Sequence, residues 1–173
     1  IFQHMEMRSK EGSFHPLFYL PEAFVVANKR RIDAMVGAVF TLLILGAWVS
    51  STAGGQYNQG CSVGFPTGWP KCNGSVLPSF EGPGVLVQMV HRFGALIVGL
   101  VLVAGSARIR SEAREHNAGT SIGRITDITA GFWMLNVMIG GTYIIAAKMD
   151  NFPEWVSLLH LVVGITGLLI ASS

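Results

Sequence analysis

Two histidines lie inside segments of the chain that are otherwise apolar: His91 in QMVHRFGALIVGLVLVAG (residues 88–105) and His160 in SLLHLVVG (residues 157–164). An ionisable group is expensive at membrane depth and is normally kept there for a function. A neutral imidazole is a common metal ligand. Two imidazoles that approach from different helices can bind both faces of a haem, so the sequence predicts His91 and His160 as axial ligands of a haem iron.

A second interpretation of the same residues stays open. A histidine in a membrane span often only makes a hydrogen bond that supports packing, and glycines in such helices often serve close helix contact. Small residues follow each histidine on its own face and predict room for a flat group: Gly94, Ala95 and Gly99 after His91, then Gly164 and Gly167 after His160. Arg92, directly after His91, is suited to pair with a haem propionate.

The elements that must position these side chains are membrane spans. Half of the 173 residues are hydrophobic and only 13% are charged, and the mean hydropathy of +0.48 excludes an ordinary water-soluble domain. Four apolar segments are long enough to cross a membrane, at about residues 34–51, 85–107, 128–147 and 155–173. The predicted fold is an all-α membrane protein, with an antiparallel bundle of four transmembrane helices at residues 33–173 and a cytoplasmic N-terminal segment at residues 1–32.

The basic residues predict the orientation of the spans. They precede the first span and fill the loop between the second and third, whereas the opposite side holds only Lys71 and Lys148. The positive-inside rule therefore places both termini in the cytoplasm and residues 53–84 outside. Spans two and four then run in the same direction, and each histidine lies on the order of 8 Å below the outer surface.

The start of the chain and the distribution of its basic residues bear on processing and on partners. No cleavable signal peptide is expected, because the first apolar segment begins only after residue 33. The opening IFQHM at residues 1–5 is interpreted as a cloning scar. The basic residues are scattered along loops and not interleaved with aromatic residues, so the predicted partner is the lipid membrane and no nucleic acid is expected.

Both cysteines, Cys61 and Cys72, lie in the predicted external loop, in GCSVGFPTGWPKCNG. They face the oxidising side of the membrane in a loop stiffened by Pro66 and Pro70, which predicts a disulfide. Two unpaired thiols are the alternative. A zinc site is disfavoured, because two cysteines fall short of the usual four ligands and no histidine lies in this loop.

Five motifs in order along the chain resemble the heme A synthase family of membrane haem-modifying enzymes: STAGGQYNQGC, GWPKCNG, QMVHR, LNVMIGGTYII and SLLHLVVG. The resemblance covers roughly residues 35–170. Most members carry two four-helix halves, whereas this chain is similar to the compact, half-length members known among archaea. That likeness implies a prokaryotic plasma membrane as its location.

The resemblance implies an oxidoreductase that converts the C8 methyl group of haem O, through an alcohol, to the formyl group of haem A for terminal oxidases. It implies His91 and His160 as axial ligands and Cys61 and Cys72 as the external pair near the haem. Haem O would be the substrate, and the electron donor is not identified by the sequence. The bound haem is then either b-type or the substrate and product, haem O and haem A.

Gln88 departs from the family's pattern. The catalytic half of long members has a glutamate three residues before the second-helix histidine, and a carboxylate can exchange protons near neutral pH whereas a carboxamide cannot. Gln88 at this catalytic position leaves two hypotheses. In the first the protein is a heme A synthase in which another acid, from the external set Glu81, Asp150 and Glu154, or a bound water handles protons. In the second it is a non-catalytic bis-histidine b-type cytochrome that transfers electrons or holds haem.

A lone four-helix half is expected to expose an apolar face that the long members cover, which predicts a homo-oligomer. Lipid is the alternative cover, because hydrocarbon tails are as apolar as leucine. Small residues that allow close helix contact are present on the first span and the third: Gly37, Gly46, Gly131, Gly140 and Gly141.

Overall fold

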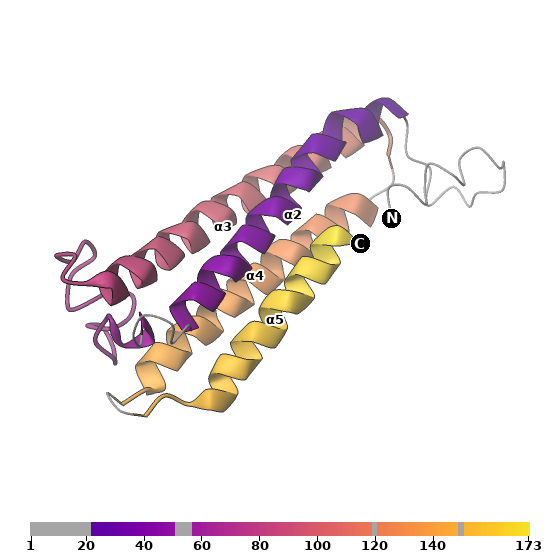
Figure 1. Ribbon diagram of the computed structural model, residues 1–173. Helices are drawn as coiled ribbons and strands as arrows, with labels where there is room; N and C mark the ends of the chain where they lie inside the picture. The colour runs from indigo at the N-terminus through magenta and orange to yellow at the C-terminus, as the bar shows by residue number, and fades with distance from the viewer. Residues whose placement is uncertain (1–21, 51–56, 119–120, 149–150) are drawn as a thin grey trace.

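The computed structural model describes residues 22–50, 57–118, 121–148 and 151–173. Its regular elements are four long helices, α2 (Glu22–Ser50), α3 (Pro83–Glu115), α4 (Ser121–Ala146) and α5 (Glu154–Ser172), and a short 3-10 helix, η2 (Tyr57–Gln59). The long helices run alternately up and down as one bundle (Figure 1). The predicted all-α, four-helix antiparallel fold is confirmed.

Each of the four long helices is long and apolar enough to cross a membrane. Large hydrophobic side chains such as Phe40, Leu100 and Leu158 are exposed on the outside of the bundle. Such a surface is unfavourable in water but is matched by hydrocarbon tails. The four helices are therefore candidate spans of a multi-pass membrane protein, and the side on which the loop and the chain ends lie stays a prediction.

The order of the helices around the bundle decides which of them can share a site. Neighbours pack as α2 with α3, α3 with α4, α4 with α5, and α5 with α2. This arrangement leaves α3 and α5 on one diagonal and α2 and α4 on the other. The second and fourth predicted spans therefore face each other across the interior, between two flanking helices.

Three helices extend beyond the apolar segments predicted from the sequence. α2 begins at Glu22, α3 continues to Glu115 and α4 begins at Ser121. Residues 22–32, which were predicted to be part of a cytoplasmic segment, thus form the first turns of α2, and residues 1–21 lie outside the described part. Hydropathy marks only the part of a helix that lies in hydrocarbon, so it gives a lower limit on helix length.

A polar cluster joins these helix extensions to each other. Asn28 on α2 is fully buried and donates a hydrogen bond from Nδ2 to the carboxylate of Glu112 on α3 at 2.9 Å. Arg31 donates from Nη1 to the other oxygen of Glu112. Because a buried polar group is costly unless it is paired, this cluster stabilises the contact of α2 with the end of α3.

Two separate clusters of buried apolar side chains fill the bundle. The larger lies toward the start of α2 and comprises Phe24, Met35, Val98, Leu102, Ile109, Ala113 and Ile122. The smaller lies under the loop that precedes α3 and comprises Cys61, Cys72, Val85 and Met89. On α3 the position of His91 falls between Met89 and Val98. His91, a predicted haem ligand, therefore lies on α3 between the residues that belong to the two clusters.

The loop between α2 and α3 carries the disulfide. Cys61 and Cys72 are joined, with their Cα atoms 4.9 Å apart, and neither cysteine is free. The predicted disulfide is confirmed, and the alternative of two unpaired thiols is wrong. The backbone N–H of Gly64 donates to the carbonyl of Ile144 on α4 at 3.0 Å, so the loop is attached to the ends of two helices.

Replacing Glu112 with Ala is expected to lower the free energy of unfolding by about 1–3 kcal/mol, because the fully buried Asn28 then loses a charged acceptor. The matched control is Asp33→Ala, which removes an ion pair to Lys29 whose two side chains are each 62% exposed, and its expected loss is about 0–1 kcal/mol. Thermal unfolding in detergent compares the two variants. Equal losses would show that the cluster around Glu112 does not stabilise the helix contact.

Candidate functional site

His91 and His160 lie on the diagonal pair of helices, in the half of the bundle that the disulfide loop covers. His91 is on α3, about two turns after its start at Pro83, and His160 is on α5, less than two turns after Glu154. The structure therefore brings together the two residues that the sequence singled out, while their binding to haem iron stays a prediction.

A backbone hydrogen bond fixes the orientation of His160. Its Nδ1 lies 3.0 Å from the carbonyl oxygen of Asn136 on α4. Because a carbonyl only accepts hydrogen bonds, Nδ1 must carry the proton and donate. The lone pair of the neutral ring is then on Nε2. A histidine whose second nitrogen donates to a carbonyl is the usual arrangement for a metal ligand, since the tautomer and the ring orientation are both set in advance.

Each histidine ring stands against a glycine of a flanking helix. A Cβ added at Gly140 on α4 would lie 2.9 Å from Cε1 of His160, and one at Gly46 on α2 would lie 3.3 Å from Cε1 of His91. A side chain at Gly140 would force the imidazole away from the carbonyl of Asn136. These glycines were predicted as contacts between chains, but they make room for the histidines within one chain.

The glycines that follow the histidines on α3 and α5 are in close helix contact. A Cβ at Gly94 would lie 3.0 Å from Leu45, and one at Gly164 would lie 3.0 Å from Leu43. Gly99 faces the indole of Trp133, which also donates from Nε1 to the carbonyl of Ala95 at 3.1 Å. At Gly94, Gly99 and Gly164 the packing interpretation therefore holds, and the prediction of room for a flat group is wrong at these three positions.

The donor set of the site fits a bis-histidine haem. It offers two neutral imidazoles from opposite helices, one of them with its tautomer fixed by a carbonyl. The interior at this level also holds a polar atom without a partner among the described residues, Oδ1 of Asn136. No group of three or more His, Cys, Asp or Glu that could hold a different metal occurs in the described ranges. Among the described residues, the candidate metal ligands at this site are therefore the two histidines His91 and His160.

Gln88 and Arg92 fasten the disulfide loop to α3. Arg92 donates from Nη1 to the carbonyls of Gly68 at 2.9 Å and Lys71 at 2.7 Å, and from Nη2 to Oε1 of Gln88 at 3.1 Å. Gln88, which is 3% exposed, donates from Nε2 to the carbonyl of Tyr57 at 3.0 Å. Both residues therefore hold the loop in place. The pairing of Arg92 with a propionate and a catalytic part for Gln88 stay predictions.

The contacts of Arg92 and Gln88 with the loop were missed by sequence reasoning, although one part of the pattern was visible. The two residues are four positions apart, so they share a face of α3 and can bond to each other. Their loop partners are backbone carbonyls, which no sequence pattern marks. The contact of Trp69 with Gly141 on α4 was also missed, because no sequence pattern marks which loop side chain packs on a given helix glycine.

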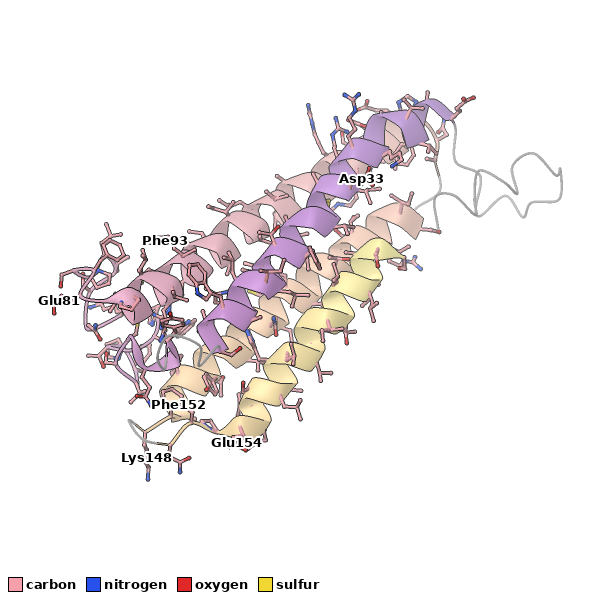
Figure 2. All side chains as sticks on the ribbon, in the orientation of Figure 1. Asp33, Glu81, Phe93, Lys148, Phe152 and Glu154 are labelled. Atoms are coloured by element: carbon pink, nitrogen blue, oxygen red, sulfur yellow. A yellow bond between two sulfur atoms is a disulfide. The ribbon has the colours of Figure 1, made fainter. Side chains whose placement is uncertain are left out.

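Two of the three carboxylates considered for proton exchange lie at the loop end of the bundle. Glu81 and Glu154 are near this end in Figure 2, together with Lys148, whereas Asp33 is toward the opposite end. Glu81 and Glu154 are both exposed, and Glu81 accepts a hydrogen bond from the hydroxyl of Ser79 at 2.9 Å. Asp150, the third carboxylate considered, lies outside the described residues.

Comparison with known proteins gives two matches. A family model described as "Cytochrome oxidase assembly protein" (COX15-CtaA) matches residues 24–172. A heme A synthase of Symbiobacterium thermophilum is 30% identical over 132 residues, which cover 76% of this chain and 38% of that protein. The chain thus aligns with well under half the length of this relative. No solved structure matches the chain.

Replacing Gly140 with Ala is expected to displace His160, because the new Cβ would lie 2.9 Å from its Cε1. The ring would lose its bond to the carbonyl of Asn136, and haem affinity is expected to fall about 10–100-fold, as for other losses of a ligand's supporting hydrogen bond. Haem titration followed by absorbance measures the change. The matched control is Gly167→Ala on α5, where a Cβ would make only an ordinary contact, 3.5 Å from Cβ of Phe132. Equal affinities in the two variants would contradict this role of Gly140.

Proposed function

Since the chain belongs to the cytochrome oxidase assembly protein family, whose members are heme A synthases and hence oxidoreductases, we propose that it oxidises the C8 methyl group of haem O to the formyl group of haem A. The observation that carries the proposal is the pair of imidazoles on α3 and α5, with Nδ1 of His160 fixed by the carbonyl of Asn136. This pair is suited to hold a haem across the diagonal of the bundle.

Each residue of the site has a separate part in this proposal. His91 and His160 would hold the haem iron, and Gly140 leaves the space in which Nδ1 of His160 meets the carbonyl of Asn136. Haem, when bound, supplies the redox-active iron and the methyl group that reacts. The loop that Arg92 and Gln88 fasten covers this end of the bundle, where it limits access of water to the site.

Proton exchange requires a group other than Gln88. A carboxamide does not titrate, and both ends of this one are engaged, with Arg92 and with the carbonyl of Tyr57. We assign proton exchange to a bound water or to one of the carboxylates at the loop end, Glu81 and Glu154. Both are exposed, so their proton exchange would proceed through water.

A b-type cytochrome that transfers electrons or holds haem is the second candidate function. It is favoured by Gln88, which gives the site a structural amide where a catalytic half carries a carboxylate. It is also favoured by the short match to the heme A synthase relative. Only 38% of that protein aligns with this chain, so the chain matches less than half of a known synthase. Bis-histidine ligation by His91 and His160 is common to both candidates, so the identity of the bound haem distinguishes them.

The setting of the site is the plasma membrane of a prokaryote, with both chain ends cytoplasmic and the disulfide loop external. In support, the start of α2 and the end of α5 lie at one end of the bundle and the loop at the other (Figure 1). The basic residues Arg108, Arg110, Arg114 and Arg124 lie where α3 ends and α4 begins. That end is cytoplasmic by the positive-inside rule.

A symmetric homo-oligomer completes the proposal. Of the five glycines considered for close contact between chains, Gly46, Gly140 and Gly141 are covered by residues of the same chain, whereas Gly37 on α2 and Gly131 on α4 meet nothing within 4 Å. These two remain as contacts for a second copy. Mass measurement in lipid discs tests this point. A Gly131→Leu variant is expected to be monomeric, and a monomeric unmodified protein that still makes haem A would contradict it.

Extraction of haem from the purified protein, resolved by type, tests the proposed activity. An oxidase of haem O is expected to hold haem O and haem A together, because both substrate and product bind the same pair of imidazoles. Expression in a host that makes haem O but not haem A provides the control, since haem A then comes from this chain alone. Protohaem as the only species, with haem O available in the host, would favour the cytochrome and overturn the enzyme.

A further inference from the structure

The two candidate ligands are supported unequally by the chain. His160 donates from Nδ1 to the carbonyl of Asn136 at 3.0 Å. Nδ1 of His91 is buried and has no hydrogen-bond partner among the described residues. On the flanking helix α2, a Cβ added at Gly46 would lie 3.9 Å from this nitrogen. Glycine offers no side-chain acceptor, so α2 supports the ring by van der Waals contact only.

This inequality has a direct effect on the strength of the two iron–nitrogen bonds. A neutral histidine that binds iron through Nε2 carries its proton on Nδ1. At His160 that proton is satisfied by a carbonyl, which also raises the basicity of the ligating nitrogen. At His91 the same proton finds no acceptor among the described residues, and burying a donor without a partner costs about 1–3 kcal/mol. Binding through His91 is therefore disfavoured relative to binding through His160.

We propose that His160 is the permanent axial ligand of the haem and that His91 is an exchangeable one. This inference rests on the proposed function, because it requires haem between α3 and α5. In the exchange His91 gives up its dative bond to iron, a small neutral ligand such as carbon monoxide or imidazole takes its place, and no electron is transferred. The exchangeable position lies on the α3 side, under the loop that Arg92 fastens.

The first experiment removes each ligand in turn with the same substitution. His91→Gly is expected to keep its haem within about twofold of the unmodified protein, to become high-spin, and to return to low-spin when free imidazole is added. His160→Gly is expected to lose haem affinity by about 10-fold or more, because the supported ligand is gone. Haem content per chain and the absorption spectrum measure both effects without any assay of activity.

The second experiment supplies the acceptor that His91 lacks. Gly46→Ser places a hydroxyl next to the ring, because the Cβ would lie 3.9 Å from Nδ1, and Gly46→Ala is the matched control with the same Cβ and no oxygen. Carbon monoxide is added to the reduced proteins, where it binds only as His91 leaves. The Ser variant is expected to bind it about 10-fold more slowly than the Ala variant.

The outcomes separate this inference from the proposed function. If neither glycine variant of the histidines changes the haem spectrum, the haem site itself is wrong. If both variants change the spectrum but lose haem equally, or if His91→Gly loses more, haem binding stands and the unequal roles are overturned. Failure of carbon monoxide to bind the Gly46→Ala variant, or equal rates in the Ala and Ser variants, also counts against an exchangeable His91.

Discussion

The hydrogen bond from Nδ1 of His160 to the carbonyl of Asn136 is the interaction on which the candidate site depends. It exists because Gly140 has no side chain at the point where the imidazole meets α4. It determines the tautomer of His160 and so leaves the lone pair of the neutral ring on Nε2, as a metal ligand requires. One absent side chain and one backbone carbonyl thereby fix the orientation and the tautomer of this histidine.

The remaining structure places that ligand opposite a second one. The order of helices around the bundle sets α3 and α5 on a diagonal, and the polar cluster around Glu112 joins α2 and α3 far from the site. At the other end Arg92 uses three hydrogen bonds to hold the disulfide loop and Gln88. Arg92, next to His91, therefore holds the loop, while Nδ1 of His91 has no hydrogen-bond partner among the described residues.

Sequence reasoning predicted the parts of this arrangement that depend on residue type and hydropathy. The four long apolar helices and the pairing of Cys61 with Cys72 follow from composition and spacing, and so does the placement of His91 and His160 on the second and fourth of these helices. It could not predict the helix extensions, since Asn28 and Glu112 meet only through packing. It also missed that Gly46 and Gly140 serve the histidines, because a glycine in a span gives the same signal whether it faces a ligand, another helix or another chain.

Electron paramagnetic resonance of the oxidised, unmodified protein tests the central claim most directly, because it reports the axial ligands of the iron without any substitution. Two imidazoles, from His91 and His160, predict a low-spin ferric signal at low temperature. A purely high-spin signal, or no haem signal from protein purified with haem available, would contradict ligation of haem by His91 and His160.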